Sequence, residues 1–245
     1  MRAAATLAFW VTGVVAVFLT FPVAALLRLA TAPFDPDRRA VGAWLRLVAR
    51  SLLHACPFWR VTVEGAVPPP PQRYVVVPNH RSMLDALAVG CVPGETKWMG
   101  KASAFSFPWL GWAFHLAGYV PVVRGDRGSG ARALARMRAW LDRGLPVGVF
   151  AEGTRSRGGP LQPFRAGPFK LAAEAGVPIV PVAISGAGEA MPADQPFVRP
   201  ARIRIRILEP ISTAGLGQDA VERLRDETRA RIAEALGDVM TLVKP

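Results

Sequence analysis

The chain has 245 residues, 51% of them hydrophobic, with a mean hydropathy of +0.25, so a single α/β domain with one substantial core is the default expectation. The formal net charge of +12 is carried mostly by arginine, which predicts a polyanionic partner: nucleic acid, anionic lipid or a phosphorylated substrate. Cys56 and Cys91 form no C-x-x-C pattern, which argues against a disulfide framework and against a cysteine-based metal site.

The first expected element is an apolar helix. Residues Ala3 to Leu27 carry no charged side chain, and a run of about 20 apolar residues can cross the hydrocarbon layer. A signal peptide is disfavoured, because the run exceeds the roughly 7–15 residues of a signal h-region and no small-x-small cleavage site follows it. Pro22 leaves open whether the segment spans the bilayer or is kinked or re-entrant. The arginines that follow outnumber Arg2, so the remaining chain is expected in the cytoplasm, at the cytoplasmic membrane.

A second helix is expected from Ala40 to Cys56, with apolar residues at helical spacing and basic residues between them. This pattern fits a helix lying in the membrane interface, and it fits equally a helix packed on the domain core. Residues 1–57 are therefore predicted as a membrane-associated helical region, and residues 58–245 as the α/β domain.

Strands and helices alternate through the second region. This order predicts an α/β fold in which a mixed, largely parallel central sheet is flanked by helices. One further strand alternates arginine with isoleucine, which predicts a half-exposed strand with one basic face. Strands are expected at Trp59–Glu64, Arg73–Val77, Gly118–Val123, Leu145–Phe150, Ile179–Ile184 and Ala201–Leu208, and helices near Ser82–Val89, Gly130–Asp142, Phe169–Ala175 and Asp219–Leu236.

The segment from Asn79 to Asp85 is the first candidate for chemistry. His80 falls on a strand-to-helix loop, and histidine is the usual general base near neutral pH. Asp85 can orient its ring if His80 is still on the loop and Asp85 lies in the first helical turn. Ser82-x-x-Asp85 also resembles a capping box, in which Asp85 merely closes the helix, and the two roles can coexist.

The second candidate is the loop Glu152–Ser156, which follows a buried strand. Gly153 lets the backbone approach a ligand, Thr154 offers a hydroxyl, and Arg155 can grip a phosphate bidentately. An ordinary surface turn with solvated arginines is the alternative. Two further segments stand out: Phe164–Lys170, with two cations around a glycine turn, and Val177–Val182, an acyl-chain wall or a plain core strand.

Taken in order, these elements resemble the glycerophospholipid acyltransferase family, especially its 1-acylglycerol-3-phosphate acyltransferases. The resemblance covers roughly Val75 to Ile184. The family pattern Asn-His-x-Ser-x-x-Asp is met by Asn79, His80, Ser82 and Asp85; Phe-x-Glu-Gly-Thr-Arg-Ser by Phe150 and Glu152–Ser156; and Val-Pro-Ile-Val-Pro-Val by Val177–Val182.

The resemblance implies a role for each matched residue. His80 would be the general base for the acceptor hydroxyl, and Asp85 its orienting partner. Phosphate-binding residues of the acceptor site would be Glu152, Gly153, Thr154, Arg155 and Arg124, and further candidates are Asn79, Ser82, Lys101 and Lys170. The acyl donor would be acyl-coenzyme A or acyl carrier protein. No metal and no cofactor are expected, because a hydroxyl would attack an already activated donor.

One family motif departs from its pattern. The family often has Gly-x-x-Phe-Ile-Asp-Arg, whereas this chain has Gly118-Tyr119-Val120-Pro121-Val122-Val123-Arg124, so the arginine is retained but Val123 replaces the acid. The resemblance implies 1-acylglycerol 3-phosphate as the acceptor. Because this motif contributes to the acceptor site in the family, its departure here leaves another lysolipid, such as a lyso-ornithine lipid, or an acylated glycan as the alternative. Lys97 and Lys101 are expected to be solvated or to add phosphate contacts.

Two readings outside this enzyme class remain, a membrane-anchored basic scaffold and a nucleic-acid binder. The scaffold predicts loss of the base or its partner, and both are present. Nucleic-acid binding lacks a recognised module. Membrane lipid, a lysophospholipid and the acyl donor are therefore the expected partners, with no nucleic acid.

Overall fold

The structure is a computed structural model that describes residues 2–70, 72–156, 159–192, 195, 197–215 and 220–237. Its described strands form one sheet in the order β1-β7-β6-β2-β5-β3-β4. Every neighbouring pair is parallel except β6 and β7, which confirms the predicted mixed, largely parallel sheet. The strands are β1 (Trp59–Glu64), β2 (Val75–Pro78), β3 (Lys97–Lys101), β4 (Val120–Val122), β5 (Val147–Gly148), β6 (Ile179–Ser185) and β7 (Ala201–Ile207).

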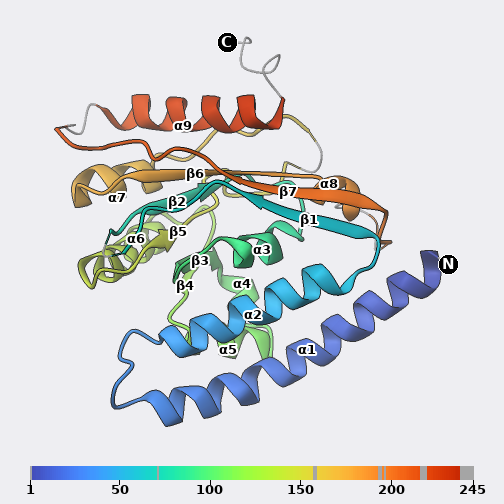
Figure 1. The fold of residues 1–245 in the computed structure, drawn as a ribbon. Helices are drawn as coiled ribbons and strands as arrows, with labels where there is room; N and C mark the ends of the chain where they lie inside the picture. The colour runs from blue at the N-terminus through green and yellow to red at the C-terminus, as the bar shows by residue number, and fades with distance from the viewer. Residues whose placement is uncertain are drawn as a thin grey trace.

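Helices cover both faces of the sheet (Figure 1). Successive side chains of a strand point to opposite faces, so Val75 and Val77 of β2 pack with α6, α7 and α9, while Val76 packs with α2 and α3. The helices are α1 (Arg2–Thr31), α2 (Arg39–Ala55), α3 (Asp85–Ala88), the 3-10 turn η1 (Val89–Cys91), α4 (Ala102–Phe105), α5 (Leu110–Leu116), α6 (Arg127–Asp142), α7 (Gly167–Ala175), α8 (Ala187–Ala190) and α9 (Val221–Leu236).

Several elements differ from the expectation based on the sequence. The helix expected near Ser82 begins only at Asp85, because residues 81–84 form turns held by the Asp85 side chain. Strand β3 was not expected, because its Lys-Trp-Met-Gly-Lys sequence lacks the apolar pattern of a buried strand. Helix α1 continues through Pro22 to Thr31. Asp219, the expected start of the last helix, lies outside the described residues.

Helix α1 lies lengthwise against the rest of the protein. Near its beginning, Oγ1 of Thr6 accepts a hydrogen bond from the Val198 N–H at 3.2 Å. Further along, the ring of Phe21 packs 5.1 Å from the ring of Trp112 in α5. Figure 1 shows α1 running beside α2, on the side of α2 away from the sheet. By length and composition α1 could cross a membrane. In this structure Thr6 near its beginning and Phe21 further along both contact the domain.

Helix α2 packs on the core. Val41 and Leu53 are completely buried, so its apolar face is covered by protein and not by solvent. Of the two readings of its amphipathic pattern, the structure therefore supports packing on the domain.

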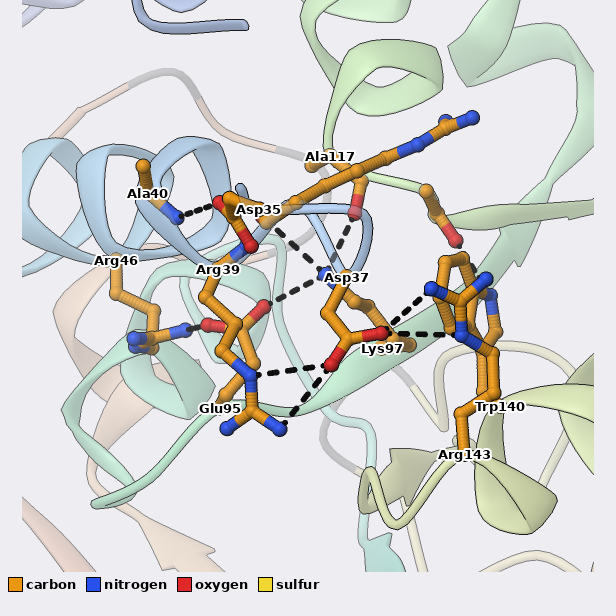
Figure 2. Close-up of polar contacts among 12 residues, drawn as sticks. Asp35, Asp37, Arg39, Ala40, Arg46, Glu95, Lys97, Ala117, Trp140 and Arg143 are labelled. Carbon is orange, nitrogen blue, oxygen red and sulfur yellow. Dashed lines mark hydrogen bonds and ion pairs between the residues drawn. The ribbon is translucent and has the colours of Figure 1, made fainter. Parts of the chain in front are cut away.

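A buried ionic network joins α2 to the sheet (Figure 2). Lys97 at the start of β3 has no exposed surface, and its Nζ donates to Oε1 of Glu95 at 2.8 Å and to the Ala117 carbonyl at 2.9 Å. The other oxygen of Glu95 binds Arg46 of α2, and the Trp140 ring lies 5.2 Å from Nζ. Burial lowers the pKa of Lys97, and the charge of Glu95 opposes that shift. Lys97 is thus neither solvated nor available to a phosphate.

The connection between α1 and α2 is anchored to the same region. Asp35 accepts the N–H groups of Arg39 and Ala40 at 2.9 and 2.8 Å, which satisfies free donors at the start of α2. Asp37 accepts from Arg143, at the end of α6, at 2.6 Å (Figure 2). The helical region is therefore tied to the sheet and to α6 by charged hydrogen bonds.

Replacing Lys97 by methionine should destabilise the protein, because Glu95 would lose one of its two buried cations. We expect a loss of roughly 3 kcal/mol in the free energy of unfolding, measured by chemical denaturation in detergent. Lys170→Met is the control, because Lys170 is exposed and lies 3.7 Å from Glu174 of its own helix. That change should cost less than about 1 kcal/mol. Equal losses in the two variants would contradict a structural role for the buried lysine.

Candidate active site

The parallel strands bring the predicted site residues to one edge of the sheet. Strands β2, β5, β3 and β4 lie side by side and run in the same direction. Each candidate follows or ends one of them: His80 after β2, Glu152 after β5, Lys101 at the end of β3 and Arg124 after β4. Ligands of open α/β sheets bind at the carboxyl ends of the strands. Segments far apart in sequence thereby form one candidate site.

His80 and Asp85 form the expected pair. The Nδ1 atom of His80 lies 3.1 Å from Oδ2 of Asp85, and Asp85 is completely buried. The same Oδ2 accepts the N–H groups of Arg81 at 2.6 Å and Ser82 at 2.7 Å. An ionised carboxylate only accepts, so Nδ1 must donate to it, which leaves Nε2 as the basic nitrogen. Asp85 therefore both orients the His80 ring and closes the turn before α3. The two roles considered for it from the sequence coexist.

The imidazole also rests on an aromatic ring. The Phe150 ring lies 4.3 Å from the His80 ring, and only 13% of the His80 side chain is exposed. This packing holds the ring in place while one edge meets solvent.

Asn79 and Ser82 support the loop and do not face the site. Asn79 is buried, and its amide donates to the Ile184 carbonyl at 3.0 Å and accepts the Ile184 N–H at 2.7 Å. The Ser82 hydroxyl, also buried, donates to the Met191 carbonyl at 2.9 Å. These side chains join the His80 loop to β6 and to the end of α8, so their polar atoms are already used within the fold.

Glu152, predicted to contact the acceptor phosphate, binds two backbone N–H groups in this structure. It is 4% exposed, and its two oxygens accept the N–H groups of His80 at 2.5 Å and Gln162 at 3.0 Å. The pKa of Glu152 is raised to about 7, chiefly because the carboxyl group is buried and in addition because the Asp85 charge is near, while the two hydrogen bonds oppose the shift. Glu152 thus holds the His80 main chain against the loop after β5.

Three arginines gather beside this loop. A side chain on Gly153, where φ is +68°, would collide with Arg165, because its Cβ would lie 3.1 Å from Cζ of that guanidinium. Burial, and then the positive charges of Arg165 and Arg155, lower the pKa of Arg124. Among the described residues, no carboxylate lies within ion-pair distance of Arg124, Arg155 or Arg165. Such a group of unpaired guanidinium groups is a favourable site for an anion.

The remaining candidates divide by position. Thr154 and Lys101 are exposed at the same edge of the sheet. Lys170 lies on an exposed face of α7 and is close to Glu174, so the structure does not bring it to His80. Arg157 and Gly158 lie outside the described residues. The segment Val177–Val182 includes four buried residues of β6, which supports the interpretation as a core strand.

The departure at Val123 has a local explanation. Its side chain is 50% exposed, and its N–H donates to the Ser129 hydroxyl at 2.9 Å. The acid displaced along the chain, Asp126, accepts the Ser129 N–H at 2.9 Å and caps α6. Because Asp126 is used as a helix cap, Arg124 has no carboxylate partner at this place in the fold.

Arg165 was missed as a site residue by sequence reasoning. The segment Phe164–Lys170 stood out for its cations around a glycine, but nothing in its spacing placed it beside Gly153. That proximity arises because the Arg165 N–H donates to the Ala151 carbonyl at 2.9 Å, which lays the two segments side by side.

Comparison with known proteins identifies the family. The acyltransferase family profile matches residues 60–185. A 1-acyl-sn-glycerol-3-phosphate acyltransferase of Chlamydomonas reinhardtii is 35% identical over 229 residues, which cover 89% of this chain and 64% of the algal protein. The 1-acyl-sn-glycerol-3-phosphate acyltransferase alpha of Mus musculus is 35% identical, covering 80% of this chain and 71% of the mouse protein. The chain belongs to the acyltransferase family.

The fold has a solved counterpart. The crystal structure of the 1-acyl-sn-glycerophosphate (LPA) acyltransferase PlsC from Thermotoga maritima superposes with a TM-score of 0.75 at 22% identity, covering 96% of this chain and 95% of that one. At that identity the likeness concerns the fold alone. The chain spans less than two thirds of the algal relative's length.

The raised pKa of Glu152 predicts a pH effect on stability. The folded protein retains this proton up to pH about 7, whereas the unfolded chain releases it near the usual value of 4.5. Raising the pH through that window therefore favours unfolding. Relative to Glu152→Gln, the free energy of unfolding of the unmodified protein should fall from pH 4.5 to 7 and change little above it. The free energy of unfolding of the exposed Glu174→Gln variant should depend on pH as that of the unmodified protein does. The same pH dependence in Glu152→Gln would refute the raised pKa of Glu152.

Proposed function

We propose that this protein transfers a fatty acyl group from an acyl thioester, acyl-coenzyme A or acyl carrier protein, to the free hydroxyl of 1-acylglycerol 3-phosphate, giving phosphatidic acid. The observation that carries the proposal is the His80–Asp85 pair, 3.1 Å apart, at the sheet edge that also bears the unpaired arginines. The family membership and the names of the algal and mouse relatives support the same reaction.

The chemistry follows from the orientation of the ring. Nε2 of His80 takes the proton of the acceptor hydroxyl while Asp85 holds Nδ1–H and stabilises the imidazolium that forms. The acceptor oxygen attacks the thioester carbonyl carbon, a C–O bond forms and the C–S bond breaks. The departing thiolate takes the proton from Nε2, which restores the neutral ring. The thioester is already activated, so the proposed step needs no metal and no cofactor.

The acceptor headgroup is assigned from charge. A phosphate monoester carries about −1.5 to −2 charges near pH 7, and guanidinium groups bind it bidentately. Arg155 and Arg124 are the proposed contacts, with the Gly153 backbone beside them. Another lysolipid is the second candidate, and the exposed Val123 in place of the family's acid is the observation that favours it.

The outer face of α1 supports association with a membrane. Leu7, Val11, Phe18 and Leu19 are each more than half exposed. Because the opposite side of α1 packs on α2 and α5, we propose that the helix lies along the membrane surface with this apolar face in the lipid, and that the sheet edge faces the cytoplasm.

Replacing His80 by alanine should remove the base and lower kcat by about 10²–10⁴-fold. The measurement is acyl transfer to 1-acylglycerol 3-phosphate in detergent, with unfolding followed in parallel. His54→Ala is the control, because that histidine is exposed on α2 and its Nδ1 lies 2.8 Å from the Arg50 carbonyl oxygen. Undiminished activity of His80→Ala would overturn the mechanism, and the scaffold reading predicts no activity in any form.

Introducing charge on the outer face of α1 should weaken membrane binding. The double change Val11→Glu and Phe18→Glu removes two apolar side chains worth roughly 1.5–3 kcal/mol each when buried, so partition into lipid vesicles should fall at least about tenfold. Val63→Glu is the control, because Val63 is 42% exposed and lies on strand β1 and not on the outer face of α1. Vesicle flotation after detergent removal measures the effect, and equal flotation of all three proteins would exclude the proposed orientation.

A further inference from the structure

Arg165, which lies against the loop after β5, is a cation without a role in the reaction proposed above. Arg165 is exposed, and its guanidinium lies over the backbone of Gly153, close enough to exclude a Cβ there. Its main-chain N–H donates to Ala151 at 2.9 Å, so the base of the side chain is fixed to the strand end that also carries Glu152. Glu152 in turn holds the main chain of His80. The position of Arg165 relative to the catalytic loop is therefore set by the backbone and not by a flexible surface segment.

The arrangement costs free energy in the absence of an anion. Several arginines of the described structure pair with acids, as Arg143 does with Asp37 and Arg231 with Glu227. Arg165, Arg155 and Arg124 have no such partner among the described residues, and they lie close enough for the charges of the first two to lower the pKa of the third. Like charges held together without a counterion repel one another, and a bound anion removes that cost.

We propose that Arg165 is the third cationic arm of the acceptor site and the residue that selects a phosphate monoester over headgroups with one negative charge or none. This inference rests on the proposed acyl transfer. A phosphate diester has one negative charge and two terminal oxygens, whereas a monoester has up to two negative charges and a third terminal oxygen that can accept from a third guanidinium group. Arg165 is thus a binding and specificity residue, while His80 retains the chemistry.

The test compares acceptors in the full-length protein. Arg165→Gln should raise KM for 1-acylglycerol 3-phosphate by about 10–100-fold, the range expected for a lost charge-assisted hydrogen bond. The kcat at saturation should change little, and transfer to an uncharged monoacylglycerol with the same acyl chain should keep its KM. Arg165→Lys should recover part of the loss, because it restores the charge but not the bidentate geometry. Arg223→Gln on α9, an exposed arginine outside the site, should match the unmodified protein.

A binding measurement separates this inference from the reaction itself. Glycerol 3-phosphate should raise the Tm of the unmodified protein and of Arg223→Gln, and raise it less in Arg165→Gln. If the unmodified protein transfers acyl groups to neither acceptor but this difference in Tm is found, the proposed reaction fails and the anion site stands. An unchanged KM for the phosphate acceptor, an equal rise in KM for both acceptors, or equal Tm shifts in all variants would each overturn the role of Arg165.

Discussion

The parallel alignment of β2, β5, β3 and β4 is the constraint on which the site depends. In a parallel sheet all carboxyl ends meet at one edge, so each strand delivers its following loop to the same place. His80, the loop from Glu152 and the arginine Arg124 come from three such loops. A shift in the pairing of β2 and β5 would separate His80 from Glu152, whose carboxylate accepts its N–H at 2.5 Å.

Most polar side chains at the site serve geometry. Asp85 binds two main-chain N–H groups besides the imidazole, Asn79 binds both polar groups of Ile184, and Glu152 joins two loops. Buried polar groups need partners, and here the partners are the backbone of the catalytic loop itself. The loop is thus held on several sides before any substrate binds, and only the arginines are left for the ligand.

The helical region is attached to this framework by charge as much as by apolar packing. Lys97 lies at the beginning of β3, and the same strand ends at Lys101 on the site edge. The buried cation therefore connects the turn before α2 to a strand that reaches the candidate site. With α1 packed along α2, the apolar surface of α1 has a fixed position relative to His80, which suits the proposed transfer to an acceptor in a lipid layer.

The sequence by itself determined the sheet class, most of the strands and the pairing of His80 with Asp85, because these depend on local pattern and on short loops. It also identified the loop with Arg155. Only the tertiary structure decided that Lys97 is a buried ion-pair partner, that Glu152 accepts the main-chain N–H of His80, and that the Arg165 side chain lies beside Gly153. Those outcomes depend on strands and loops distant in sequence, and residue type alone does not say whether a charged side chain meets solvent, a buried carboxylate or another chain segment. Asp126 illustrates the same limit, since its role as the cap of α6 was settled by where that helix begins.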